Sequence, residues 1–227
     1  VIVRNFKTVR KSEELKGYVI IILLSIAGIT ASRVITSGDT LFRSFDEAAF
    51  QVVSVMTTTG FATADYSMWP AFSHTIIFLV MFIGGCAGST AGGIKVARVL
   101  ILLKVLRRDV KRIIHPRVVD TICMGGRIVE EPVLSSATLY FFIYTMVVII
   151  STIIVSLDNL SFIASFSAAM TCAGNVGPGI DALGPSGNFS PCGPVSKITL
   201  CFAMLFGRLE LMPMLVLFMY PFSKNSR

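Results

Sequence analysis

Charged residues are scarce in this chain, and their scarcity excludes an ordinary soluble domain. Only 15% of its 227 residues are Asp, Glu, Lys or Arg, whereas charged residues make up about 25% of typical globular proteins. Hydrophobic residues make up 54%, and the mean hydropathy is +0.77. They form four long apolar stretches, at residues 18–35, 71–103, 133–157 and 198–222. Because a helix of roughly 20 apolar residues spans a bilayer, we expect an all-α integral membrane protein.

Residue patterns typical of enzymes and of metal sites are also missing. The five cysteines have no metal-ligand spacing, and no Ser/His/Asp set or pair of carboxylates stands out. The chain begins at Val1 and has no signal-peptide pattern. We therefore expect neither an enzyme nor a covalently bound cofactor, and we interpret the sequence as a piece of a longer protein.

The net charge of +7 is distributed unevenly along the chain. Sixteen of the 20 Lys and Arg residues lie in residues 1–16, in residues 95–127 or at positions 224 and 227. The segments on the other side of the apolar stretches carry more acidic than basic residues. This is the positive-inside pattern, which predicts a multi-pass protein with both termini and the central linker in the cytoplasm. It argues against nucleic-acid binding, and it predicts contact of the basic segments with anionic lipid headgroups.

Each half of the chain contains a short apolar segment between its two long ones. These segments, at residues 45–58 and 160–171, are too short to span a bilayer. A polar stretch with a glycine follows each, which predicts a re-entrant helix and a loop covered by protein or by a water-filled cavity. The two halves therefore repeat in the same orientation. Such copies can be related by rotation about an axis along the membrane normal. Matching Met-Thr pairs and glycines place the repeats 114 residues apart.

Residues 71–106 are too long for a single span and contain five glycines between positions 84 and 93. Glycine destabilises a helix by about 1 kcal/mol relative to alanine. We predict a broken helix, with helical segments at 71–83 and 94–106 around a loop at 84–93. The alternative is a helix that ends at the membrane surface before a flexible linker, but the loop has apolar helix on both sides and no charged residues.

Four motifs resemble the Trk/Ktr/HKT superfamily, closest to its TrkH branch. They are MTTTGFATAD at residues 56–65, GGCAGSTAGGIK at 84–95, AGNVGPG at 173–179 and GRLE at 207–210. The resemblance covers essentially the whole chain. It implies tandem M1–pore helix–M2 repeats of potassium-channel-like architecture, of which this chain contains the third and the fourth.

The predicted bounds follow from this repeat. The third repeat covers 1–106, with M1 at about 18–36, its pore helix at about 45–58, its filter at 58–61 and a broken M2 at about 71–106. A basic cytoplasmic linker covers 107–132. The fourth repeat covers 133–227, with M1 at about 133–157, its pore helix at about 160–171, its filter at 172–175 and M2 at about 195–222.

The two glycine-containing loops are the predicted potassium sites. A potassium ion in a narrow filter exchanges its hydration water for backbone carbonyl oxygens. Glycine tolerates the dihedral angles that point successive carbonyls toward one axis, and the C-terminal ends of the preceding helices carry partial negative charge. The resemblance implies that K+ is the transported ion and binds at Thr58, Thr59, Gly60 and Phe61, and at Cys172, Ala173, Gly174 and Asn175.

Arg208 lies about ten residues into the last apolar stretch, where a charge costs at least about 2.5–3.5 kcal/mol. We expect it to face the pore and to repel cations, as the resemblance also implies. Pairing with a buried carboxylate is the alternative, although Glu210 lies on a different helix face. The resemblance further implies an intramembrane gate under the filter. Its predicted residues are Gly84, Gly85, Gly88, Ser89, Thr90, Gly92 and Gly93, with Arg208 as the barrier.

The resemblance implies potassium uptake across the bacterial inner membrane through a channel-like pore. It also implies three protein partners: the N-terminal half of the same subunit, a second subunit in a homodimer, and a cytoplasmic nucleotide-binding regulatory subunit. Two alternatives stay open. One is a sodium- or proton-coupled secondary cation transporter, for which broken helices are also typical, and the other is a non-transporting membrane scaffold. Two re-entrant loops of the same orientation favour a pore.

Overall fold

The computed structural model describes residues 12–115 and 121–208. The predictions for residues 1–11, 116–120 and 209–222, including Glu210, lie outside the described residues. The helices are α2 (Glu13–Ser37), α3 (Leu41–Met56), α4 (Ala71–Phe82), α5 (Val96–Ile114), α6 (Glu131–Ser156), α7 (Phe162–Gly174) and α8 (Pro194–Arg208). Two short 3-10 helices, η1 (Tyr66–Met68) and η2 (Asp181–Leu183), and a small antiparallel hairpin of β1 (Cys123–Met124) and β2 (Arg127–Ile128) complete the described fold.

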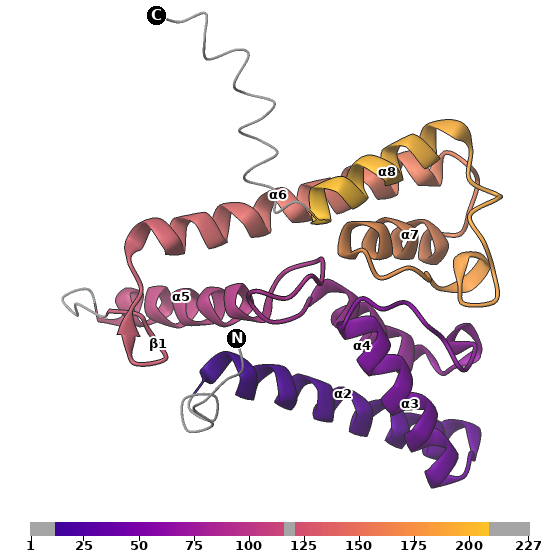
Figure 1. Cartoon of the computed structure of the whole chain (residues 1–227), viewed down its shortest axis with the longest axis horizontal. Coiled ribbons are helices and arrows are strands. Elements are labelled where there is room, and N and C mark those ends of the chain that lie inside the picture. Colours follow the sequence, from indigo (N-terminus) through magenta and orange to yellow (C-terminus); the bar gives the residue numbers. More distant parts are fainter. Residues whose placement is uncertain (1–11, 116–120, 209–227) are drawn as a thin grey trace, which may run out of the picture.

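The two long helices α2 and α6 are apolar enough to cross a membrane. They contain 25 and 26 residues, with mean hydropathies of 2.2 and 2.3 over their most apolar windows. Ser12 caps the start of α2 by accepting a hydrogen bond from the Leu15 N–H, and Gly38 ends that helix in the left-handed conformation. The two helices lie on opposite sides of the structure in Figure 1, with α4, α5 and α7 between them.

The short helices α3 and α7 pack against the long helices of their own halves, α2 and α6. Helix α3 begins four residues before the predicted position and ends at Met56. Helix α7 ends at Gly174 rather than at the predicted position 171. Small residues in the last turn of α7 allow this extension, because Ala173 and Gly174 fit where the helix is fully buried.

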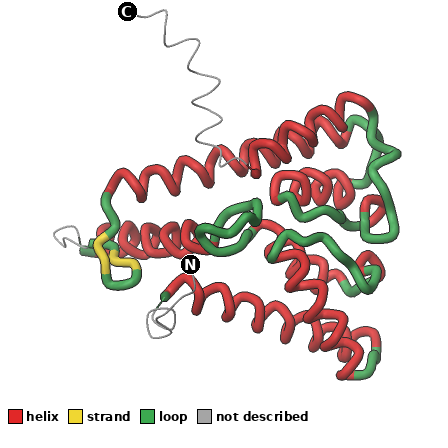
Figure 2. The backbone as a smooth tube through the Cα atoms, in the orientation of Figure 1, coloured by secondary structure: helices red, strands yellow, loops and turns green. Residues whose placement is uncertain are grey.

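The stretch at 71–106 consists of two helices, α4 and α5, with residues 83–95 between them. Figure 2 shows this green loop enclosed by helices near the centre of the molecule. The Gly84 N–H donates to the Ile94 carbonyl at 2.9 Å, and the Val96 N–H donates to the Gly85 carbonyl at 3.2 Å, so the two ends of the loop are joined. Helix α5 continues to Ile114, so the first part of the predicted linker, residues 107–114, is helical, as its sequence pattern indicated.

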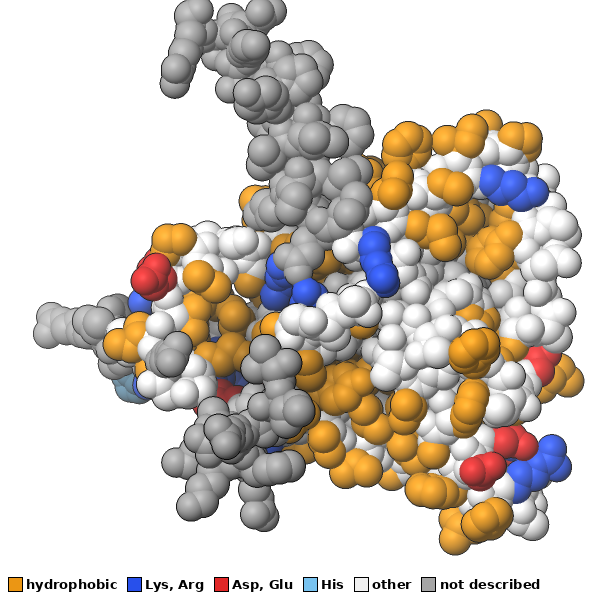
Figure 3. Space-filling view, viewed as in Figure 1, with side chains coloured by type: hydrophobic (Ala, Val, Ile, Leu, Met, Phe, Trp, Pro, Cys, Tyr) orange, Lys and Arg blue, Asp and Glu red, His pale blue; other side chains and the backbone are white. Residues whose placement is uncertain are grey.

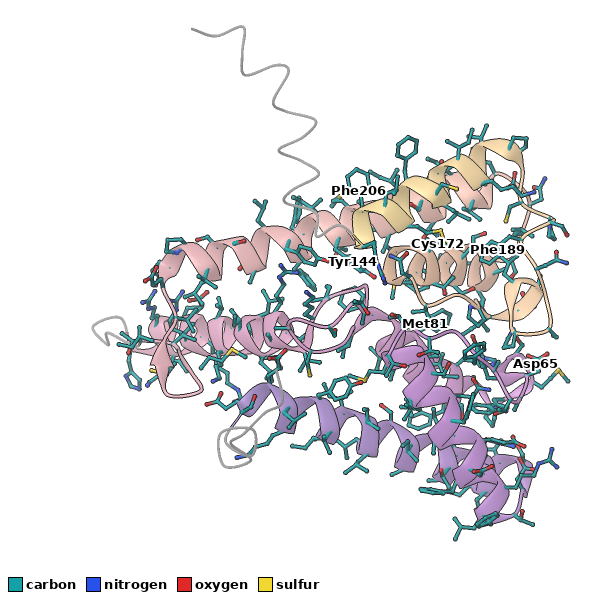
Figure 4. All side chains as sticks on the ribbon, viewed as in Figure 1. Asp65, Met81, Tyr144, Cys172, Phe189 and Phe206 are labelled. Atoms are coloured by element: carbon teal, nitrogen blue, oxygen red, sulfur yellow. The ribbon has the colours of Figure 1, made fainter. Side chains whose placement is uncertain are left out.

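The two largest of three buried clusters hold most of the helices together. The larger one contains side chains from both halves, including Met81 of α4 and Tyr144 of α6, and Phe206 of α8 packs against it. The smaller one joins α6, α7 and α8 around Cys172, with Phe189 packed against it, as the labelled side chains in Figure 4 show. Figure 3 shows apolar side chains over much of the visible face and acidic ones at its two ends, as expected for a protein surrounded by lipid.

Candidate functional site

The loop after α3 turns sharply through Thr58, which has a φ of 53°. The Thr59 N–H then donates to the Ser54 carbonyl at 2.9 Å. The Ser54 hydroxyl donates to the Phe61 carbonyl at 2.6 Å. These two bonds hold residues 58–61 against the end of the helix.

The loop after α7 has the same hydrogen bonds, although its residues differ. Asn175 has a φ of 52°, and the Val176 N–H donates to the Thr171 carbonyl at 2.9 Å. The Thr171 hydroxyl donates to the Pro178 carbonyl at 3.0 Å. Each of these residues is 117 positions after its counterpart in the first loop. The structural repeat is therefore 117 residues, and the offset of 114 taken from matching residues is wrong.

The second loop consequently begins later than we predicted. Cys172, Ala173 and Gly174 form the last turn of α7, and the exposed fractions of Cys172 and Ala173 are 3% and 1%. Only Asn175 of the predicted segment 172–175 belongs to the loop. The left-handed turn sets this boundary, and asparagine adopts that conformation more readily than most residues. The counterparts of Thr58, Thr59, Gly60 and Phe61 are Asn175, Val176, Gly177 and Pro178.

The two loops contact each other directly. A Cβ atom on Gly60, whose φ is 78°, would lie 2.4 Å from the Val176 carbonyl oxygen. A Cβ atom on Gly177 would lie 3.5 Å from the Gly60 Cα. The Tyr66 hydroxyl also joins the halves, because it donates to the Pro178 carbonyl at 3.2 Å. The site therefore combines uncharged carbonyl and hydroxyl oxygens with the negative ends of α3 and α7, which suits an alkali cation.

Two acidic residues outside the long helices hold the loops that connect these elements. Asp65 accepts hydrogen bonds from the Ser186 hydroxyl and from the Ser67 N–H. The bond from Ser186 is the main cause of the lowered pKa of Asp65. Bonds from Ser196 and from the Gly193 N–H likewise lower the pKa of Asp158. Asp65 thus links the loop of the first half to the loop of the second half.

The glycine-rich loop at 83–95 lies beside the end of α8. The Arg208 Nη1 donates to the Thr90 carbonyl at 2.6 Å. In the described part of the chain this carbonyl, rather than a carboxylate, is the partner found for Arg208. The guanidinium and the loop border a cavity of about 250 Å³, which is lined among others by Ser89, Lys95, Arg98 and Tyr140. Three cationic side chains, those of Lys95, Arg98 and Arg208, line this space.

Several contacts of the site were not predicted from the sequence. Glu14, at the start of α2, accepts a hydrogen bond from the Ala87 N–H at the tip of the glycine-rich loop. The Tyr140 hydroxyl donates to the Gly93 carbonyl at 3.2 Å. Ser54 and Thr171 were missed as well, although a hydroxyl residue four positions before a turn at Thr58 or Asn175 could have indicated them.

The described fold is almost entirely helical, and two of its helices are long and apolar enough to cross a membrane. The sequence profile of the TrkH family, described as a cation transport protein, matches residues 16–227. The chain therefore belongs to the TrkH family of cation transport proteins, which confirms the resemblance found in its motifs. Its relatives are transport proteins, in agreement with the prediction that the chain is not an enzyme.

Named relatives and a solved structure agree with this assignment. The Trk system potassium uptake protein TrkI of Halomonas elongata is 36% identical over 208 residues, which cover 91% of this chain and 42% of that protein. TrkH of Escherichia coli K12 is 39% identical over 175 residues, which cover 77% and 36%. The crystal structure of the potassium transporter TrkH from Vibrio parahaemolyticus matches with a TM-score of 0.83 at 34% identity, covering 92% and 44%. The chain thus spans about two fifths of the length of these relatives.

Proposed function

We propose that this chain is part of a pore-forming subunit that conducts potassium into the bacterial cell. One observation carries the proposal: two loops with equivalent hydrogen bonds follow the helices α3 and α7 and meet at Gly60 and Val176. Repeated loops around a common axis are typical of cation filters, where backbone oxygens replace the hydration water of the ion. The names of the relatives, potassium uptake proteins, support K+ as the transported ion.

The proposed filter residues are those of the two structurally equivalent loops. They are Thr58, Thr59, Gly60 and Phe61 in the first half, and Asn175, Val176, Gly177 and Pro178 in the second. Asn175 is kept from the sequence prediction, whereas Cys172, Ala173 and Gly174 are replaced because they are helical and buried. No carboxylate occurs in either segment, so selection of K+ rests on the geometry of oxygen dipoles.

The proposed gate is the glycine-rich loop with its predicted residues Gly84, Gly85, Gly88, Ser89, Thr90, Gly92 and Gly93. Arg208 is the proposed electrostatic barrier. Its bond to the Thr90 carbonyl supports a shared role, because it connects the charge to the loop. An arginine bonded to a carbonyl keeps its full charge, since a carbonyl oxygen does not neutralise a cation.

We propose the third and fourth M1–pore helix–M2 repeats for this chain, in a subunit whose N-terminal half supplies the other two. In this proposal the first M1 is α2 and the second M1 is α6. The broken M2 corresponds to α4 and α5, and the second M2 begins with α8. A homodimer, a cytoplasmic nucleotide-binding regulatory subunit and cytoplasmic termini in the inner membrane are further parts of the proposal, supported by the charge pattern and by family membership.

Flux measurements on the complete subunit test this function. Liposomes containing the wild type and its regulatory subunit should take up potassium or rubidium, and Arg208→Ala should raise the uptake because it removes the positive charge beside the proposed gate. Lys197→Ala is a suitable control, since Lys197 lies at the opposite end of α8. Uptake that requires a sodium or proton gradient would instead support the coupled transporter. Absence of uptake by the folded wild type would refute the channel.

A further inference from the structure

The glycine-rich loop lies directly against the helix that carries the second proposed filter segment. A Cβ atom on Gly92 would lie 2.4 Å from the Gly174 carbonyl oxygen and 3.1 Å from the Asn175 Cβ. Gly174 is the last residue of α7, and Asn175 begins the filter loop. No side chain separates the two backbones at this point, so the loop cannot move toward α7 without displacing it.

Helix α8 forms a second connection between the same two elements. The Asn175 Nδ2 donates to the Met204 carbonyl at 3.0 Å. One turn later, Arg208 donates to the Thr90 carbonyl of the glycine-rich loop. Between these bonds, a Cβ atom on Gly207 would lie only 1.8 Å from the Ala173 carbonyl oxygen. The end of α7 therefore contacts both the glycine-rich loop and the end of α8 through backbone atoms, and the Arg208 side chain joins α8 to the loop.

We infer that Gly92 and Asn175 are specificity-determining residues that couple the position of the gate to the geometry of the second filter segment. The inference rests on the proposed function of the two segments. Closely packed backbone has few alternative arrangements and responds to displacement by shifting as a unit. When the loop moves to admit ions, the support beneath Gly174 and Asn175 changes, and the carbonyl groups of residues 175–178 change position with it.

The contacts of Gly92 with Gly174 and Asn175 lie on the side of the second filter segment. The first filter segment meets the second one where Gly60 lies against Val176. A substitution in the gate should therefore alter ion selectivity only if it touches α7. Two glycines of the loop provide a matched pair for this test, because neither has a φ that disfavours alanine.

The first comparison uses Gly92→Ala and Gly85→Ala in the complete subunit with its regulatory subunit in liposomes. The added methyl group of Gly92→Ala meets the Gly174 carbonyl, whereas that of Gly85→Ala meets Ser89 and Ala91 within the loop itself. Both variants should change the rate of potassium flux. Only Gly92→Ala should change the ratio of potassium to sodium flux, by about 2- to 30-fold, the range found for residues that connect two sites.

A second variant keeps the test decisive if Gly92→Ala does not fold. Asn175→Asp retains a residue that tolerates the left-handed conformation, but it replaces the amide donor by a carboxylate facing the Met204 carbonyl. Asn175→Asp should lower the ratio of potassium to sodium flux. Adding Arg208→Ala to this variant should bring the ratio closer to the wild-type value, because loss of the Arg208 bond releases the loop. An unchanged ratio in a conducting Asn175→Asp or Gly92→Ala subunit would refute the coupling alone. A folded wild type without potassium flux would refute the function on which it rests.

Discussion

The two proposed filter loops have the same backbone hydrogen bonds but almost no sequence identity. Residues 54–61 read SVMTTTGF and residues 171–178 read TCAGNVGP, with the glycines at 60 and 177 in common. In both loops a hydroxyl on the helix donates to the carbonyl seven residues later. The comparison shows that this repeat preserves a pattern of donors and acceptors, and that each half satisfies it with its own residues.

The last helical segments of the two halves differ more strongly. In the first half, α4 and α5 are separated by residues 83–95, whereas α8 is continuous from Pro194 to Arg208. The break provides the proposed gate, and the continuous helix provides the arginine beside it. One half therefore contributes a loop and the other a charge, so a repeated architecture produces an asymmetric site.

The largest expected effect comes from a substitution where the two loops touch. In Gly60→Ala the new methyl group would meet the Val176 carbonyl, and alanine would be strained at a φ of 78°. Strain of this kind costs about 1–3 kcal/mol, so potassium flux should fall by about tenfold or more. Gly38→Ala is the matched control, because its φ is 68° with open space around it. Equal fluxes in the two variants would contradict a special role for the contact.

An intermediate effect should distinguish the two hydroxyl donors. Thr171→Val removes the bond to the Pro178 carbonyl and the bond that Thr171 accepts from the Gly177 N–H. Ser54→Ala removes only the bond to the Phe61 carbonyl. At about 1 kcal/mol for each lost bond, Thr171→Val should lower the thermal unfolding midpoint and the potassium-to-sodium flux ratio more than Ser54→Ala.

The reverse order in both measurements would show that the first loop depends more on its hydroxyl. Thr199→Val serves as a control, because the Thr199 hydroxyl bonds within its own helix, to the Val195 carbonyl. It should change neither the midpoint nor the flux ratio appreciably.

The smallest effect concerns the link between the halves at Asp65. Its pKa is lowered in the folded protein, so its contribution to stability is complete above the ordinary aspartate value of about 3.9. The contribution is lost as the pH falls through the lower folded value. Ser186→Ala removes the main cause of the shift, so the variant should lose less stability on acidification than the wild type.

Thermal unfolding of the detergent-solubilised subunit between neutral pH and about pH 3 would measure this difference. Ser190→Ala, in the same connecting segment, provides the comparison, because Ser190 bonds to Asn188 and not to Asp65. A Ser186→Ala subunit with the same acid dependence as the wild type would show that the bond to Asp65 contributes nothing.

Particular residues show where prediction from the sequence succeeded and where it failed. The five glycines among residues 84–93 predicted a loop inside an apolar stretch, and the structure has a loop at residues 83–95. The Met-Thr pairs at 56 and 170 suggested a repeat of 114 residues, but these residues are not equivalent in the structure. The match was misleading because two identical residues can occur by chance. The equivalent positions are the left-handed turns at Thr58 and Asn175, and these two residues differ in type.

Local properties of the sequence determined the membrane class, the family and the position of the helix break, because apolar length and glycine content act within one segment. Only the tertiary structure decided where the second loop begins, since the last turn of α7 stays helical where it is buried among α4, α6 and α8. The contacts of Gly92 with Gly174 and of Arg208 with Thr90 join residues 82 and 118 positions apart. Such contacts arise from the packing of whole helices, which no single segment specifies.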